Sequence, residues 1–200
     1  MSRTKLQINL LLILFFSMEL HSSCPTPLSW DYPYIPYNGE YSASVVLTYT
    51  PLCILHYKYC YRTTPCCYDF AITEVSLEGD CNQFKNTDTL IKYASRDLIS
   101  NVNPWGGVIP ECPEQSSRHW RQSTATCFTD FYWDPVTLRW TSVPCDRDGQ
   151  ERWCWIYYQY CWYWNNNQRY LRETIIEFNM GGPPCPKFDP YGRRCNQKCQ

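Results

Sequence analysis

The alternation of apolar and polar positions along the chain predicts several long β-strands. Residues 53–60 alternate as a half-buried strand does, and 154–161 repeat the cysteine spacing and the Tyr-x-Tyr-Cys ending. A turn and a return strand follow each of them, over 68–77 in the first copy and 170–180 in the second. The pattern therefore predicts two related antiparallel hairpins that arose by internal duplication, with a further strand at 42–50.

Alternate side chains of a strand point to opposite faces, which divides each paired strand into two sets. Seven residues of strand cover roughly 23 Å, whereas bonded cysteines have Cα atoms about 4.4–6.8 Å apart. Cys53 therefore cannot bond Cys60, and each cysteine must bond another element. The face whose character is kept in both copies is the predicted core face: Cys53, Leu55, Tyr57, Tyr59 and Tyr61, then Cys154, Ile156, Tyr158, Tyr160 and Trp162.

One helix is predicted between the hairpins, over about residues 86–101. Asn86 or Thr87 caps its start, and Pro104 prevents it from continuing. The fold class is therefore mainly β, with a minor α+β character. Residues 120–133 and 136–143 predict two more strands, and the Pro/Gly/Cys-rich tail from Gly181 predicts an irregular segment. The apolar stripe of the helix is Leu90, Ile91, Ala94, Leu98 and Ile99.

Residues 1–23 have the features of a secretory signal peptide, with two basic residues before a short apolar run. No other segment approaches the ~18 apolar residues of a transmembrane helix. Cleavage before Cys24 would also suit a lipoprotein. His21, however, lies where that signal prefers a branched apolar residue, so lipid anchoring at Cys24 is the disfavoured alternative to a secreted or cell-surface protein.

The mature chain divides into two predicted units, 24–111 and 112–200. The first holds an extended Pro/Tyr-rich arm over 24–41, a hairpin and the helix, and the second holds a hairpin and the Cys-rich tail. Cys-Pro opens both units. Removal of the signal leaves 16 basic and 18 acidic residues, a net charge of −2, which gives no electrostatic reason to expect nucleic acid as a partner.

All cysteines follow the signal peptide, and an even number in an exported chain predicts disulfides rather than free thiols. Metal binding is the competing explanation. No Cys-x-x-Cys pair occurs and only His56 and His119 remain after signal removal, so we expect neither a metal nor a cofactor. The 14 disulfide candidates are Cys24, Cys53, Cys60, Cys66, Cys67, Cys81, Cys112, Cys127, Cys145, Cys154, Cys161, Cys185, Cys195 and Cys199.

No catalytic motif for acyl transfer, phosphate binding or dinucleotide binding occurs in the chain. Glu74 and Glu177 occupy equivalent positions in the two hairpins, and a carboxylate pair can cleave glycosides. Outward-facing glutamates are also common in half-exposed strands, which is the simpler explanation. We therefore predict that the protein is not an enzyme and keep a glycoside hydrolase as the third alternative.

Aromatic side chains crowd both faces of the second paired strand, and they provide the binding candidates Trp155, Tyr157 and Tyr163. A half-buried strand hides only one face, so these residues need a cover. A second layer such as the Pro/Tyr arm is one explanation. An exposed patch for a protein partner or a sugar is another, because Tyr and Trp join apolar area to a polar tip. An edge strand that pairs with another subunit is the third.

Several short motifs are spread over most of the mature chain: Tyr59-Cys60-Tyr61-Arg62, Asp69 to Cys81, Asn103-Pro104-Trp105-Gly106, Cys112-Pro113, Trp120-Arg121 to Cys127, Pro144-Cys145 and Cys185-Pro186. In these motifs the chain resembles cysteine-rich exported proteins of Bacteroidota-type bacteria. That resemblance implies export and a surface setting but no reaction, and the pair Cys66-Cys67 and the basic tail depart from it. We predict a secreted structural or interaction protein that binds a protein partner or itself, with a carbohydrate-binding module as the alternative.

Overall fold

The computed structural model describes residues 24–25, 35–114, 119–125, 127–145, 153–179 and 185–197. The predicted signal peptide with its cleavage site, half of the Pro/Tyr arm (26–34), and Cys199 lie outside these residues. The strands are β1 (Glu40–Tyr49), β2 (Leu52–Thr63), β3 (Cys67–Gly79), β4 (His119–Ala125), β5 (Cys127–Thr129), β6 (Tyr132–Asp134), β7 (Arg139–Ser142), β8 (Trp153–Asn165), β9 (Gln168–Asn179) and β10 (Cys195–Gln197).

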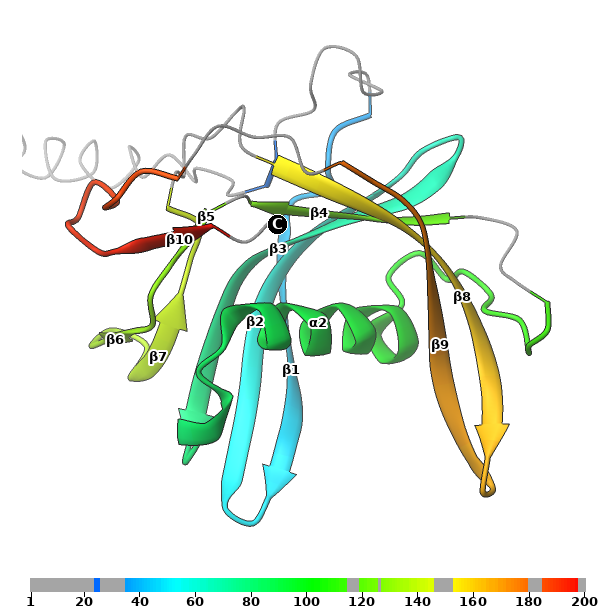
Figure 1. Cartoon of the computed structure of the whole chain (residues 1–200), viewed down its shortest axis with the longest axis horizontal. Coiled ribbons are helices and arrows are strands. Elements are labelled where there is room, and N and C mark those ends of the chain that lie inside the picture. Colours follow the sequence, from blue (N-terminus) through cyan, green and yellow to red (C-terminus); the bar gives the residue numbers. More distant parts are fainter. Residues whose placement is uncertain are drawn as a thin grey trace, which may run out of the picture.

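One curved sheet contains eight of these strands and joins both predicted units (Figure 1). Its main path runs β1-β2-β3-β4-β8-β9, and β7 pairs with β3 and carries β6. The β3–β4 pair is the one parallel pair among the described strands, whereas the others are antiparallel. The short strands β5 and β10 form a separate two-stranded sheet. The predicted mainly β class is confirmed.

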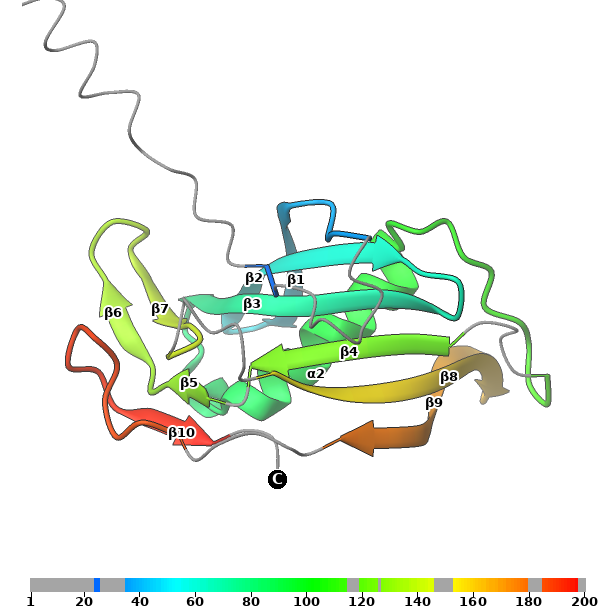
Figure 2. The same ribbon diagram turned by 90° about the horizontal axis from the view of Figure 1, so that it is seen from above.

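The helix α2 (Thr87–Asp97) lies across the concave face of the sheet, as Figures 1 and 2 show from two directions. The Asn86 side chain caps it by accepting a hydrogen bond from the Thr89 amide. A π-helical turn (Leu98–Val102) continues α2 and ends where Asn103 adopts a left-handed conformation with φ of 39°. The predicted helix over 86–101 is confirmed, and its five stripe residues are all buried.

Polar contacts fix the C-terminal half of α2 to the sheet on two flanks. The Tyr57 hydroxyl on β2 donates a 2.6 Å hydrogen bond to the Asp97 carboxylate, which also accepts one from Asn101. Lys92 and Arg96, on the opposite flank of the helix, form ion pairs with Glu173 on β9. The helix therefore bridges β2 and β9, two strands that lie far apart in the sheet.

Burial confirms the predicted core face of β2, where Cys53, Leu55, Tyr57 and Tyr59 are buried beneath α2. The opposite side of the sheet, turned away from α2, is called the outer face below. The β8 side chains follow the same alternation less strictly, because only Cys154 and Tyr160 of the predicted core set are fully buried.

The hairpins β2–β3 and β8–β9 share one irregularity. Each return strand has a β-bulge that leaves an extra residue, Thr73 in β3 and Ile176 in β9. These residues occupy equivalent positions in the predicted duplication. In the second hairpin, β8 is shifted by two residues relative to the alignment of the two copies. Gln159 aligns with Lys58, which lies opposite Glu74, but Tyr157 rather than Gln159 lies opposite Glu177. A two-residue shift keeps every side chain on its face. The edge strand β1 also has an irregularity, between Val46 and Thr48.

Six disulfides join pairs of described cysteines, and Cys154 forms a further disulfide. The exclusion of a Cys53–Cys60 bond is confirmed, because both residues bond other elements. Cys24–Cys60 and Cys112–Cys161 are equivalent in the two predicted units, whereas Cys127–Cys185 has no counterpart. The pairs are Cys24–Cys60, Cys53–Cys81, Cys66–Cys67, Cys112–Cys161, Cys127–Cys185 and Cys145–Cys195.

Two predicted segments differ from the structure. The strand predicted over 120–133 is divided into β4, β5 and β6, because β5 leaves the main sheet to pair with β10. The tail predicted as irregular therefore contributes a strand, which Cys145–Cys195 ties down. Within the described part of the chain, no helix is long and apolar enough to cross a membrane.

Candidate functional site

The β8–β9 hairpin projects beyond the neighbouring strands and ends in exposed aromatic side chains (Figure 1). Tyr163 and Tyr170 are each 39% exposed and stack with ring centroids 5.5 Å apart. Trp164 is 63% exposed, and the Arg169 guanidinium lies 4.5 Å above the Trp162 ring. These five residues are called the aromatic tip.

Local sequence and two tethers explain why the aromatic tip is well formed. Asn166 and Asn167 both have positive φ, which a tight hairpin turn requires and asparagine tolerates. Beyond residue 158, β8 no longer pairs with β4, and residues 110–112 pair with it instead. Trp162 exchanges backbone hydrogen bonds with this segment, and Cys112–Cys161 anchors it covalently. The tip is therefore presented in one geometry.

The predicted binding residues do not form one cluster. Trp155 and Tyr157 lie half-buried on the outer face, with ring centroids 4.9 Å apart in an edge-to-face arrangement. Tyr163 follows Tyr157 by six residues, about 20 Å along the strand, and lies at the aromatic tip. Part of the arm lies over the outer face, since the Tyr37 hydroxyl donates to Ser123, the residue opposite Trp155. The described arm residues thus support the second-layer explanation at Trp155.

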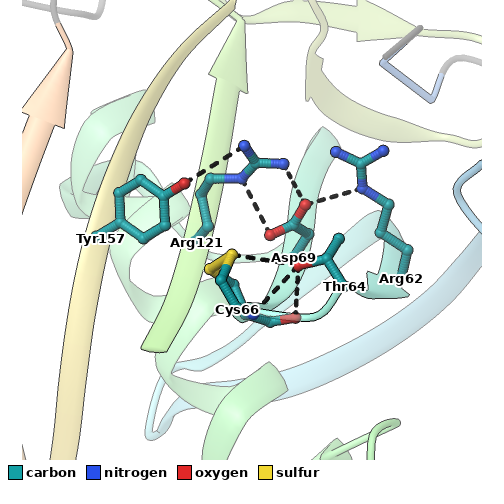
Figure 3. Close-up of a disulfide and its surroundings, with 7 residues drawn as sticks. Arg62, Thr64, Cys66, Asp69, Arg121 and Tyr157 are labelled. Carbon is teal, nitrogen blue, oxygen red and sulfur yellow. Dashed lines mark hydrogen bonds and ion pairs between the residues drawn. A yellow bond between two sulfur atoms is a disulfide. The ribbon is translucent and has the colours of Figure 1, made fainter. Parts of the chain in front are cut away.

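A buried charge cluster crosses the same outer face (Figure 3). Arg62, Asp69 and Arg121 lie opposite one another on β2, β3 and β4. The Asp69 carboxylate is 0% exposed; Arg62 donates to it at 2.8 Å, and Arg121 donates to it through Nε at 3.0 Å and through Nη2. Sequence reasoning missed this cluster. The available signal was a charged residue near one end of each of three predicted strands.

Aromatic residues complete the charge cluster. The Arg121 guanidinium also contacts the Tyr157 hydroxyl at 3.5 Å, and Arg62 lies 4.6 Å from the Tyr37 ring centroid. Arg62 donates a further hydrogen bond to the Ile35 carbonyl. The pKa of Tyr37 is raised to about 12, mainly by burial and secondly by the negative charge of the Asp69 carboxylate. The cluster therefore joins the arm to β2, β3, β4 and β8.

A polar cleft of about 230 Å³ opens between β1, β2, β3 and β7. His56 bonds the Glu78 carboxylate at 2.8 Å, and Arg139 contacts the same carboxylate oxygen. Lys58 forms an ion pair with Glu74. The lining residues are Ser42, Ala43, Ser44, His56, Tyr57, Lys58, Glu74, Ser76 and Arg139.

Glu74 and Glu177 do not form a glycosidase pair. Glu74 is on β3 and Glu177 is on β9, three strand spacings apart in the sheet. At about 4.8 Å per spacing they are separated by about 14 Å, more than the ~5–9.5 Å that such mechanisms need. Among the described residues, no group of three His, Cys, Asp or Glu side chains is arranged to hold a metal ion.

His56 makes stability depend on pH in a defined direction. Its pKa is lowered, first by burial and then by Arg139, against the opposing effect of Glu78. The unfolded chain therefore binds this proton more readily than the folded chain. The contribution of His56 is present above the ordinary pKa of about 6.5 and is lost as the pH falls below it.

We expect the melting temperature to fall between about pH 7.5 and 5.5, and to fall less in His56→Gln. Glu78, Glu173 and Asp189 have lowered pKa values and titrate below this window. Thermal unfolding followed by circular dichroism across the range measures the difference. Identical pH profiles for the two proteins would contradict the assignment to His56.

Comparison of the chain with protein-family models, with curated proteins and with solved structures gives no significant match, so its function is inferred from its own geometry.

Proposed function

We propose that the protein is a secreted, non-enzymatic interaction protein that binds an extracellular protein partner through the aromatic tip. The observation that carries the proposal is the combination of exposure and rigidity at Tyr163, Trp164 and Tyr170. Trp, Tyr and Arg are the residues enriched among those that dominate binding energy at protein interfaces. The tip contains all three types.

Rigidity matters because a binding surface that is already ordered loses less entropy on association. The Cys112–Cys161 disulfide and the backbone bonds of Trp162 fix the tip before any partner arrives. The stacked Tyr163–Tyr170 pair and the Arg169–Trp162 contact restrict the side chains in turn. Both faces of the hairpin therefore offer ordered aromatic area.

An extracellular setting is consistent with the cysteine chemistry. Disulfides persist in oxidising compartments and are rare in the cytosol, where thiols are kept reduced. The pairs that join distant residues hold the arm, the hairpins and the tail to the sheet. Disulfides of this kind keep the binding surface folded outside the cell even when no partner is bound.

Trp164→Ala is expected to weaken partner binding by about 2 kcal/mol or more, which is roughly 30-fold in Kd. Trp133→Ala is the matched control, because Trp133 is 49% exposed on the β6–β7 hairpin, away from the tip. The control should bind within a few-fold of wild type. Trp164→Ala should not change the melting temperature appreciably, since that side chain is largely in solvent. Trp133→Ala loses an edge-to-face contact with Trp140, so it serves as a control for binding and not for stability.

The partner is identified with a photo-reactive phenylalanine at position 163, irradiated in the extracellular fraction of the source cells. A specific adduct, absent when the label is placed at position 132, supports the proposal and provides the ligand for the Kd measurement. A homodimer adduct identifies a second copy as the partner. A protein that forms no adduct and stays monomeric at rising concentration overturns the proposal. Glycan-array binding lost in Trp155→Ala would favour the carbohydrate alternative instead.

A further inference from the structure

The disulfide Cys66–Cys67 joins adjacent residues at the turn between β2 and β3 (Figure 3). The other five pairs join residues separated by 28 to 58 positions. A disulfide stabilises a fold mainly by closing a loop in the unfolded chain, and the effect grows with loop length. A bond with a sequence separation of 1 closes no such loop. Stabilisation by loop closure therefore does not explain why this disulfide is present.

The two sulfurs of this disulfide differ in access. Cys67 is 0% exposed, whereas Cys66 is half-buried. The Thr64 hydroxyl lies 3.4 Å from the Cys66 sulfur, and it also accepts a hydrogen bond from the Cys67 amide. The turn is thus held with Cys66 toward solvent. A thiolate arriving from outside reaches the Cys66 sulfur, which makes Cys67 the leaving group.

His119 lies next to this leaving group. It lies opposite Cys67 in the parallel β3–β4 ladder, and paired residues of neighbouring strands are about 5 Å apart. The Gln159 amide nitrogen lies 3.3 Å from His119 Nε2. In the tautomer that accepts this amide hydrogen bond, the imidazole carries its hydrogen on Nδ1. That N–H can donate a hydrogen bond to a departing thiolate.

The charge cluster adds a favourable field. Asp69 follows Cys67 by two residues on the same face, and two guanidinium groups contact its single carboxylate. Figure 3 shows the disulfide beside this cluster. Neighbouring positive charge stabilises a thiolate and speeds its departure. The described surroundings of Cys67 thus combine a hydrogen-bond donor, His119, with two guanidinium groups.

We propose that Cys66–Cys67 is a thiol–disulfide exchange site whose reactant is an external thiol. A thiolate RS⁻ attacks the Cys66 sulfur, the Cys66–Cys67 bond breaks, and Cys67 leaves as a thiolate that accepts a hydrogen bond from His119 and then takes a proton from water. A second thiolate attacks the R sulfur of the mixed disulfide, which releases RSSR and the Cys66 thiolate, and water protonates that thiolate in turn. The protein disulfide is reduced by two electrons and two RSH are oxidised to RSSR, with their protons ending on the two cysteines.

The test treats the purified, folded chain with reduced glutathione, followed by acid quenching, alkylation and peptide mass spectrometry. Cys66 and Cys67 should become labelled at least about tenfold faster than the cysteines of the five long-range pairs, with the glutathione adduct on Cys66. Equal rates across the disulfides, or an adduct on Cys67 in place of Cys66, would overturn the proposal.

Two histidine variants test the role of His119. His119→Leu should slow exchange at Cys66 by about threefold or more, because the leaving thiolate loses its hydrogen-bond donor. His56→Leu is the matched control, since His56 lies in the polar cleft and not on β4. The long-range disulfides report on structure within each sample, because a loosened fold would speed their reduction. Equal Cys66 rates in both variants would overturn the role of His119.

Discussion

Asp69→Asn is expected to lower the free energy of unfolding by about 3–5 kcal/mol, the loss seen when one partner of a buried ion pair is removed. Asn has the same shape as Asp but lacks the charge, and it presents an amide donor to one of the guanidinium groups. Both arginines contact the Asp69 carboxylate, and its burial leaves water little access. The loss corresponds to a fall in melting temperature of roughly 6–20 °C.

Urea and thermal unfolding with the disulfides intact measure this effect. Asp134→Asn is the matched control, because the Asp134 carboxylate accepts hydrogen bonds from Val136 and Thr137 at an exposed turn. That control should leave the midpoint of unfolding close to the wild-type value, because these hydrogen bonds are exposed to solvent. If Asp69→Asn and Asp134→Asn have equal stability, the charge cluster does not hold the outer face together.

Removal of Cys112–Cys161 by a double alanine substitution is expected to cost about 4 kcal/mol, from the loop-closure relation and the separation of 49 residues. The hairpin should also loosen locally, because the bond anchors the base of the aromatic tip. Hydrogen exchange at residues 159–165 should therefore rise more than exchange in β2, and partner binding should weaken although every tip residue is still present.

The matched control for that experiment is Cys66→Ala/Cys67→Ala, which also removes one disulfide. Because this pair closes no loop, its loss should leave the melting temperature within a few degrees of wild type. Chemical unfolding of the three proteins under non-reducing conditions compares them directly. Equal destabilisation by the two double variants would show that loop closure is not the main contribution of Cys112–Cys161.

Local signals explain the elements that the sequence predicted. Asn86 marks the start of the helix, and Asn103 with Pro104 marks its end. Both signals act within one turn, so they survive any tertiary arrangement. The prediction that Cys53 and Cys60 lie on opposite faces of the strand followed from strand alternation alone. Here the periodicity of the strand was sufficient because a helix covers one side of β2.

Non-local pairing explains what was missed. Arg62, Asp69 and Arg121 meet because β3 and β4 pair in parallel across a long connection through α2. The register of that pair is set by packing over the whole sheet. The exposure of Tyr163 follows in the same way, since β8 leaves β4 after residue 158. Its separation from Trp155 follows instead from strand geometry, because eight residues of one strand cover about 26 Å. The disulfides between residues far apart in the sequence depended on the long-range geometry.

The irregularities in β1 and β9 have a consequence for how copies of this protein meet. These two strands end the main path of the sheet, and an exposed edge is a template on which further chains can stack into fibres. A bulge interrupts the ladder of free amides and carbonyls, so a second strand cannot extend along it in register. We therefore expect contacts between copies at high concentration to involve side chains and to separate on dilution. In the extracellular setting proposed above, such edges would let the chain display an aromatic surface without strand-on-strand stacking.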